Sequence, residues 1–174
     1  MKFVAGESFI VNSEKSNVRL STAIYGNVLN STGSIIPLIW DAISKNYELT
    51  LYSENMTRFM IEADEAVDLI EHALTLDGVN VIPNLNAFRV KDLFEIYSEK
   101  YGLKYQIGEP RISEKLHEMM FSAEESPRIK KLDNKFIMHY KEIYNEILPF
   151  HEFTSDKVVI TKNALNQVLT LKVF

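Results

Sequence analysis

The sequence predicts an α/β fold, because short strand-like runs alternate with amphipathic helical stretches along the chain. Residues 79–82, Val-Asn-Val-Ile, form one such run, and Pro83 closes it. Residues 90–101 repeat apolar side chains at helical spacing and stop at Gly102, a residue typical of helix ends. With 174 residues, 46% of them hydrophobic, the chain has the size of a single globular domain.

The other elements follow from local signals in the same way. Pro37 is tolerated in the first turn of a helix, since that position needs no N–H, and Thr161 has the side chain of an N-cap. An acidic first turn after Glu62 suits the helix dipole. The expected helices cover residues 3–16, a stretch from near Pro37 to Asn46, residues 64–75 and 90–101, and a last stretch after Thr161. The expected strands cover residues 18–25, 49–51, 79–82, 105–107 and 136–140.

Side-chain patterns also predict which parts of these elements are buried. The helix over 64–75 should bury Ala66, Leu69, Ile70 and Ala73, and the last helix Ala164, Leu165, Val168 and Leu169. Met119, Met120 and Phe121 are expected in the core. The short basic run Arg128–Lys131 is expected to be a solvated loop.

Composition excludes several functions. The formal net charge is −5 and the pI near 5.4, so the chain lacks the basic face that nucleic-acid binding needs. No apolar run approaches a membrane span, and residues 1–15 are not expected to act as a secretory signal. The absence of cysteine excludes disulfides and thiolate chemistry. A cytoplasmic protein that binds neither nucleic acid nor membrane is expected.

Three clusters hold the residues that could bind a ligand. The first is the small-residue loop Asn27–Ser34, which runs from a strand into a helix, where α/β proteins usually hold anions. The second contains Arg58. The third contains Arg111 and Glu114. Two arginines from separate loops would suit a pyrophosphate through paired hydrogen bonds, although a single surface arginine is more often an ion-pair partner.

No metal site is expected. His117-Glu118 lacks the second histidine, one helical turn later, of a zinc-protease helix. The other histidines, at positions 72, 139 and 151, have no ligand-like spacing. The sequence also contains no nucleophile elbow, Walker loop or Gly-x-Gly-x-x-Gly turn.

Read in order, the clusters resemble the C-terminal part of the UDP-N-acetylglucosamine 4,6-dehydratases of polysaccharide biosynthesis, in the extended short-chain dehydrogenase/reductase superfamily. Where that family writes R-Y-G-N-V-x-G-S-x-G-S-[IV]-I-P, this chain has IYGNVLNSTGSIIP. The family's M-T-R-F with a following E-A-V-D-L-I matches MTRFMIEADEAVDLI, and R-P-G-E-K-L-H-E matches RISEKLHE. A Thr-Ser-Asp before the last helix matches residues 154–156.

The resemblance implies a partial Rossmann-like parallel sheet with a C-terminal α/β substrate-binding lobe. The chain, residues 1–174, would be a single truncated domain, with the end of the Rossmann-like part in 1–50 and mainly the lobe in 51–174. It also implies a UDP-sugar site. Asn27 would hold the sugar–pyrophosphate region, Arg58 and Arg111 the diphosphate, Glu114 the ribose, and Ser34 the nucleotide half.

The chain departs from the family at several positions. Ile24 replaces an arginine, Asn30 a glycine, and Ile112-Ser113 a Pro-Gly pair. The family's N-terminal Rossmann half, with its glycine-rich dinucleotide loop, is not found in the sequence. Lys2 aligns with the lysine of the family's catalytic Tyr-x-x-x-Lys, as its remnant. The family uses NAD or NADP, and no cofactor is expected for this chain alone.

Three functions follow from these observations. The chain would be the UDP-sugar-binding portion of a dehydratase, without dehydratase activity of its own. Alternatively, it would be a subunit of a split dehydratase completed by a separate Rossmann chain, or a structural protein that keeps only the fold. The expected partners are a UDP-sugar and either a second copy of the chain or the complementary Rossmann chain.

Overall fold

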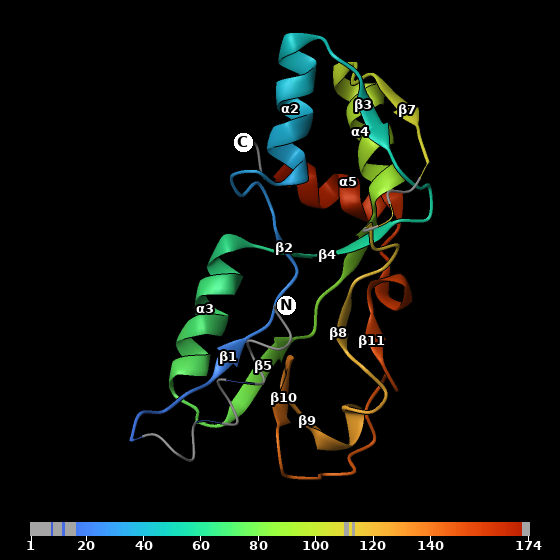
Figure 1. Cartoon of the computed structure of the whole chain (residues 1–174). Helices are drawn as coiled ribbons and strands as arrows, with labels where there is room; N and C mark the ends of the chain where they lie inside the picture. The colour runs from blue at the N-terminus through green and yellow to red at the C-terminus, as the bar shows by residue number, and fades with distance from the viewer. Residues whose placement is uncertain (1–7, 9–11, 13–16, 110–111, 113, 172–174) are drawn as a thin grey trace. The chain divides into compact units, whose positions relative to one another are not determined.

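The structure is a computed structural model that describes residues 8, 12, 17–109, 112 and 114–171. The chain forms two compact units, each assembled from three separate stretches. Unit 1 gathers the described residues within 1–25, 62–84 and 119–153. Unit 2 gathers those within 26–61, 85–118 and 154–174. Figure 1 labels the helices and strands of both units.

Unit 1 is built on a four-stranded mixed sheet in the order β1-β5-β10-β9. β1 (Thr22–Ala23) pairs with β5 (Val79–Pro83) in parallel, whereas β10 (Lys135–His139) is antiparallel to both β5 and β9 (Ile129–Leu132). Lys131, on the edge strand β9, donates its backbone N–H to the Glu146 carboxylate at 2.6 Å. The unit also holds β8 (Met119–Phe121) and the 3-10 turn η1 (Ser126–Arg128), and β11 (Phe153–Thr154) leads out of it.

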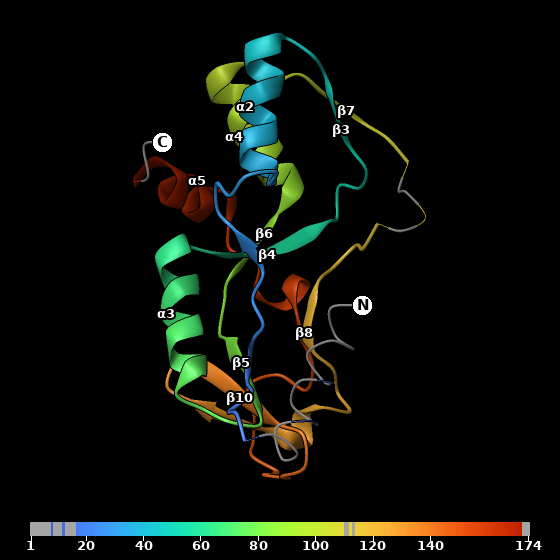
Figure 2. The ribbon, with the colours of Figure 1, turned by 60° about the vertical axis from the view of Figure 1, so that its left-hand side comes forward.

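Helix α3 (Ala63–Leu74) lies against β1 and β5, as both ribbon views show (Figure 1 and Figure 2). A capping box between Glu62 and Glu65 satisfies the first amides of the helix. Its buried residues Leu69 and Ala73 pack on the β5 and β10 side chains, in a cluster with Val79, Val81 and Ile137.

Unit 2 contains two small sheets. In the first, β4 (Thr57–Ile61) lies between β2 (Asn27–Val28), with which it is parallel, and β6 (Ala87–Arg89), with which it is antiparallel. In the second, β3 (Leu49–Leu51) and β7 (Tyr105–Ile107) form a parallel pair. The sheets therefore mix parallel and antiparallel neighbours in both units.

The helices of unit 2 bury a shared apolar cluster. Helix α2 (Ile35–Lys45) and helix α4 (Val90–Tyr101) run side by side in both views, and Trp40 contacts Tyr97 edge to face at 5.4 Å between ring centroids. The 3-10 turn η2 (Ser155–Val158) leads to helix α5 (Lys162–Leu171), which packs on α4 through Leu165.

The α/β class and most of the expected elements are confirmed. The predicted helices over 64–75 and 90–101 are α3 and α4, and the Gly102 C-cap has φ 72°. Thr161 caps α5, its hydroxyl accepting the Ala164 N–H at 3.2 Å. The expected helix over 3–16 lies mostly outside the described residues.

The structure corrects several expectations. The sheets are small and mixed, whereas the expected sheet was parallel. The reason is that the β9–β10 hairpin adds two antiparallel strands beside β5, and that β6 pairs with β4 in antiparallel. The strand over 18–25 is reduced to β1, since Leu20 bonds instead to the turn at Asp77 and Gly78. The strands that the sequence analysis did not expect are β2, β4, β6, β8, β9 and β11.

Burial predictions also need correction at three places. The basic run Arg128–Lys131 is mostly strand β9 and not a loop, because Ile129 is buried within it. Ile70 is 41% exposed, which leaves Ala66, Leu69 and Ala73 as the buried face of α3. Met119 is also exposed, while Met120 and Phe121 are buried.

Across the described ranges, no helix combines the length and the apolar character needed to cross a membrane.

The close approach of β2 to β4 predicts the effect of a substitution at Gly26. A Cβ at this residue would lie 2.4 Å from the Phe59 Cβ and 3.0 Å from the Phe59 backbone, and Phe59 is fully buried. Gly26→Ala should therefore lower the free energy of unfolding by about 1–3 kcal/mol, as overpacking does. Urea denaturation followed by circular dichroism measures it. Gly102→Asn is the control, since a Cβ there meets nothing within 4 Å and asparagine tolerates the left-handed φ. Equal losses in both variants would contradict the crowding argument.

An ion-pair network between α4 and α5 predicts a pH-dependent contribution to stability. Lys162 Nζ lies 2.8 Å from Glu95 and 2.7 Å from Glu99, and the hydrogen bond from Lys162 lowers the pKa of Glu95. A carboxyl with a lowered pKa stabilises the fold fully above its unfolded value near 4.5, and this contribution is lost as the pH falls through the folded value. Lys162→Met should cost about 0.5–1 kcal/mol at pH 7 and less at pH 3.5.

Denaturation midpoints at the two pH values measure this difference. Lys100→Met is the matched control, because its ammonium also reaches α5 but donates to the neutral Thr170 hydroxyl at 3.3 Å. A loss for Lys162→Met that does not change with pH would show that the aliphatic stem of the lysine, and not its charge, carries the effect.

Candidate functional site

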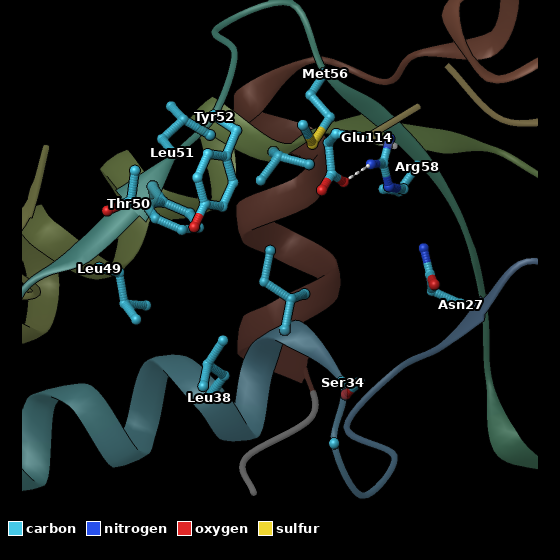
Figure 3. A pocket seen from close by; sticks show the side chains of 14 residues that line it. Asn27, Ser34, Leu38, Leu49, Thr50, Leu51, Tyr52, Met56, Arg58 and Glu114 are labelled. Carbon is cyan, nitrogen blue, oxygen red and sulfur yellow. Dashed lines mark hydrogen bonds and ion pairs between the residues drawn. The ribbon is translucent and has the colours of Figure 1, made fainter. Parts of the chain in front are cut away.

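A cavity of about 290 Å³ lies within unit 2 and is shown in Figure 3. Its wall comes from β2, β3, β4, the N-terminal ends of α2 and α4, and the segment before β8. The lining residues are Asn27, Gly33, Ser34, Ile35, Leu38, Leu49, Thr50, Leu51, Tyr52, Met56, Arg58, Val90, Phe94 and Glu114. Polar side chains gather at one end and apolar ones at the other (Figure 3).

Arg58 dominates the polar end. It lies on β4, the central strand of its sheet, between Thr57 and Phe59, which are both buried. Because side chains alternate along a strand, Arg58 points to the opposite face from these neighbours and reaches the cavity. Asn27 reaches the same cavity from β2, the parallel neighbour of β4.

The guanidinium of Arg58 is held in one orientation by acceptors from two segments. Nη1 donates to the Thr57 carbonyl at 2.8 Å and to the Leu116 carbonyl at 3.3 Å, while Nη2 donates to Glu114 Oε1 at 2.8 Å. The side chain of Arg58 is 14% exposed. Nε lies 4.0 Å from Glu118 Oε1 in an ion pair, whereas the second N–H of Nη2 makes no hydrogen bond within the described part of the chain, so the guanidinium keeps a donor for a ligand.

The N-terminus of α2 also faces the cavity. Gly33 adopts a φ of 77° that turns the chain into the helix, and Ser34 stands at the N-cap without capping it through its side chain. The Ser34 hydroxyl oxygen is buried and has no hydrogen-bond partner among the described residues. Helix N-termini present unpaired N–H groups and the positive end of the helix dipole. This corner therefore favours an acceptor-rich, negatively charged group.

The apolar end is formed by Leu38, Tyr52, Met56 and Phe94 around the strand β3. Four consecutive residues, 49–52, line the cavity, which the alternating side chains of a sheet face cannot do. The edge of β3 must therefore face it. Leu49 donates its N–H to the Lys104 carbonyl and Leu51 accepts the Gly108 N–H, so both residues bond towards β7. Thr50, between them, presents its N–H and C=O on the other edge.

The structure brings together four of the six residues that the sequence analysis selected. Asn27, Ser34, Arg58 and Glu114 all line the cavity. Lys2 and Arg111 lie outside the described residues. The sequence analysis did not select the apolar wall of Leu38 and Tyr52 or the edge of β3. The residue pattern gives no signal for that edge, because strand pairing is known only from the structure.

No group of three or more metal-ligating side chains was found in the residues that the structure places. The described residues show no glycine-rich turn of the kind that seats a dinucleotide cofactor. Such cofactors place their pyrophosphate at a helix that follows a glycine-rich turn. The turn before α2 has only Gly33 within Asn30–Ser34, and the sequence contains no Gly-x-Gly-x-x-Gly.

Several curated proteins are similar to this chain. It is 36% identical over 136 residues to an uncharacterized membrane protein of Methanocaldococcus jannaschii, covering 72% of this chain and 41% of that protein. It is 31% identical to a UDP-glucose 4-epimerase of Rickettsia bellii, over 75% of the chain and 40% of the epimerase. It is 29% identical to an inverting UDP-N-acetylglucosamine 4,6-dehydratase of Campylobacter jejuni, over 77% and 40% respectively. The chain thus spans about two fifths of the length of these relatives.

A solved structure shares the fold. The X-ray structure of Pen from Bacillus thuringiensis superimposes with a TM-score of 0.84, covering 98% of this chain and 56% of Pen, at 24% sequence identity.

The chain was expected to be the C-terminal part of a UDP-N-acetylglucosamine 4,6-dehydratase without its N-terminal Rossmann half. That expectation is wrong, because the matched stretch is homologous to the N-terminal part of epimerases and dehydratases, and Pen matches 98% of the chain. Members of the matched family use NAD or NADP. The family described as polysaccharide biosynthesis protein matches residues 2–140, and the chain belongs to it.

Proposed function

We propose that the cavity of unit 2 binds a UDP-sugar of the UDP-N-acetylhexosamine class for an enzyme of polysaccharide biosynthesis. One observation carries the proposal. An oriented guanidinium and a helix N-terminus face the same cavity as an apolar slot, and this slot is bordered by the edge of β3 that pairs with no strand among the described residues. A UDP-sugar needs these features together, because it joins a dianionic diphosphate to a flat base whose ring faces pack on apolar side chains and whose edge carries hydrogen-bonding groups.

The diphosphate belongs at the polar end. Guanidinium groups bind phosphate oxygens through paired, charge-assisted hydrogen bonds, and helix N-termini bind phosphate through their N–H groups. Arg58 keeps a donor on Nη2, and the buried Ser34 hydroxyl adds another. Asn27, on the neighbouring strand, can donate its amide to the sugar or to a phosphate oxygen. Arg111, which the sequence resemblance also assigns to the diphosphate, would add a second cation.

The base belongs at the apolar end. Leu38 and Tyr52 offer surfaces for the faces of a flat ring, and the free edge of β3 offers the backbone N–H and C=O of Thr50. Uracil presents an N–H flanked by two carbonyls, so one C=O and one N–H of an extended strand can pair with it. Cytosine has an acceptor and an amino group where uracil has this N–H and a carbonyl, so in the same orientation its groups would meet the Thr50 C=O and N–H as like with like.

Glu114 lies between these two ends. Its Oε1 accepts from Arg58, and its Oε2 makes no hydrogen bond with the part of the chain that the structure describes. A carboxylate oxygen in this position can accept from the hydroxyls of a ribose. Glu114 would then fix the ribose and hold the guanidinium at the same time.

The chain spans about two fifths of its relatives' length, and two reactions are candidates for the enzyme that it belongs to. The first candidate is 4,6-dehydration, in which this chain supplies the UDP-sugar-binding portion and is inactive alone. The second is 4-epimerisation, which the similarity to UDP-glucose 4-epimerases supports. Incubating the chain with the UDP-sugars and NAD(P), alone and with added candidate partner proteins, and analysing the products distinguishes the two. A 4-keto-6-deoxy sugar marks dehydration and a C4 epimer marks epimerisation.

Titration calorimetry tests the binding site. UDP and UDP-N-acetylglucosamine should bind, and UDP should bind more tightly than CDP because of the base edge. Arg58→Ala should weaken UDP binding by about 1.5–3 kcal/mol, the range for lost charge-assisted hydrogen bonds.

Arg89→Ala is the matched control for this titration. Arg89 lies opposite Thr57 on β6, is 47% exposed in its side chain, pairs with Asp92 and does not line the cavity. Its loss should leave UDP affinity unchanged. Equal affinity of Arg58→Ala and the parent would remove Arg58 from the site, and the absence of any UDP binding would refute the proposed function.

A further inference from the structure

Ser155 lies at the meeting point of three segments that are distant in the sequence. Its hydroxyl oxygen is 2.7 Å from the Thr57 hydroxyl on β4, and it accepts the backbone N–H of Glu118 at 2.9 Å. Its own backbone N–H donates to the Glu118 carbonyl at 2.9 Å. Ser155 thus ties η2 to β4 and to the segment that carries Glu114, all within unit 2.

This hydroxyl is deeply buried. Ser155 is fully inaccessible and Thr57 is 4% exposed, so their polar atoms must be satisfied by protein groups. The Ser155 hydroxyl can accept from Glu118 and donate to the Thr57 carbonyl, which lies 3.2 Å away. The Thr57 hydroxyl is also 2.8 Å from His117 Nδ1. These contacts join Ser155, Thr57, His117 and Glu118 into one hydrogen-bond network, directly next to Arg58 in the lining of the cavity.

The network leads directly to Arg58. The Thr57 carbonyl that Ser155 approaches is the same one that accepts from Arg58 Nη1. Glu118, whose backbone Ser155 holds at both its N–H and its C=O, places Oε1 4.0 Å from Arg58 Nε. Its other oxygen accepts the Phe59 N–H at 3.0 Å, which fixes the carboxylate against β4.

We infer that Ser155 is a positioning residue for the anion-binding guanidinium: through Thr57 and Glu118 it sets the orientation in which Arg58 meets the diphosphate. This inference rests on the proposed function for its ligand, whereas the geometry of Arg58 can be measured without any ligand. Removing the hydroxyl leaves the Glu118 N–H without its acceptor inside the protein, so the Glu118 segment must shift. Arg58 then loses the fixed geometry that makes its donors effective.

A double-mutant cycle on UDP binding tests the inference. Ser155→Ala should weaken UDP binding by about 10-fold in the parent chain, the scale of one lost buried hydrogen bond. In the Arg58→Ala background the same change should have an effect of less than about 2-fold, since a residue that acts only through Arg58 has nothing left to position. A general structural role would give the same loss in both backgrounds and would overturn the inference.

Thr154→Val is the matched control. Thr154 adjoins Ser155, is 8% exposed and hydrogen-bonds to Asp156 through its side chain. Among the described residues, none of the hydrogen bonds that join Ser155, Thr57, Glu118 and Arg58 involves the Thr154 side chain. It should perturb stability to a similar degree as Ser155→Ala while leaving UDP affinity unchanged. A loss of affinity equal to that of Ser155→Ala would overturn the inference.

A ligand-free measurement separates this inference from the proposed function. The Arg58 Nε–H signal in a ¹⁵N–¹H correlation spectrum is identified by its disappearance in Arg58→Ala. It should move and exchange faster with solvent in Ser155→Ala, and it should be unchanged in Thr154→Val. An unchanged signal in Ser155→Ala overturns the positioning role even if UDP binds. A changed signal supports that role even if the parent chain fails to bind UDP, an outcome that refutes only the proposed function.

Discussion

The polar half of the cavity depends on holding one guanidinium, 14% exposed, in a single orientation. A charge removed from water in this way must be surrounded by acceptors, because an unpaired buried charge is far more costly than a paired one. The Thr57 and Leu116 carbonyls and the Glu114 carboxylate supply them. Two of these three acceptors come from the segment before β8, so that segment must lie along β4 whenever Arg58 is in place.

The charges around Arg58 limit what the site can bind. Glu114 and Glu118 bring two carboxylates to one guanidinium, so these three groups together are not positive. Attraction of a dianion must come from directed hydrogen bonds and from the N-terminus of α2 more than from net charge. Selection by geometry of this kind favours a ligand of matching shape over free phosphate.

Part of the fold and of the site could be predicted from the sequence, and the physical reasons differ from element to element. Helix α4 has a regular apolar stripe and a glycine that can adopt a φ of 72°, so its end is specified locally. Arg58 and Glu114 could be predicted because each is a charged residue in a motif, MTRF and RISEKLHE, that resembles a motif of the family. Strand β4 was missed because its buried face continues through Phe59, Met60 and Ile61 and gives no alternation. Ser155 could not be found from pattern, because its role comes from contacts with residues 98 and 37 positions away.

The edge strand β9 combines two features that discourage strand addition. Its side chains Lys130 and Lys131 carry like charges along the edge of the sheet, and the Lys131 N–H is occupied by the Glu146 carboxylate. An incoming strand would have to displace that carboxylate and approach two ammonium groups before it formed a first ladder hydrogen bond. This side of unit 1 is therefore protected against edge-to-edge aggregation at high concentration.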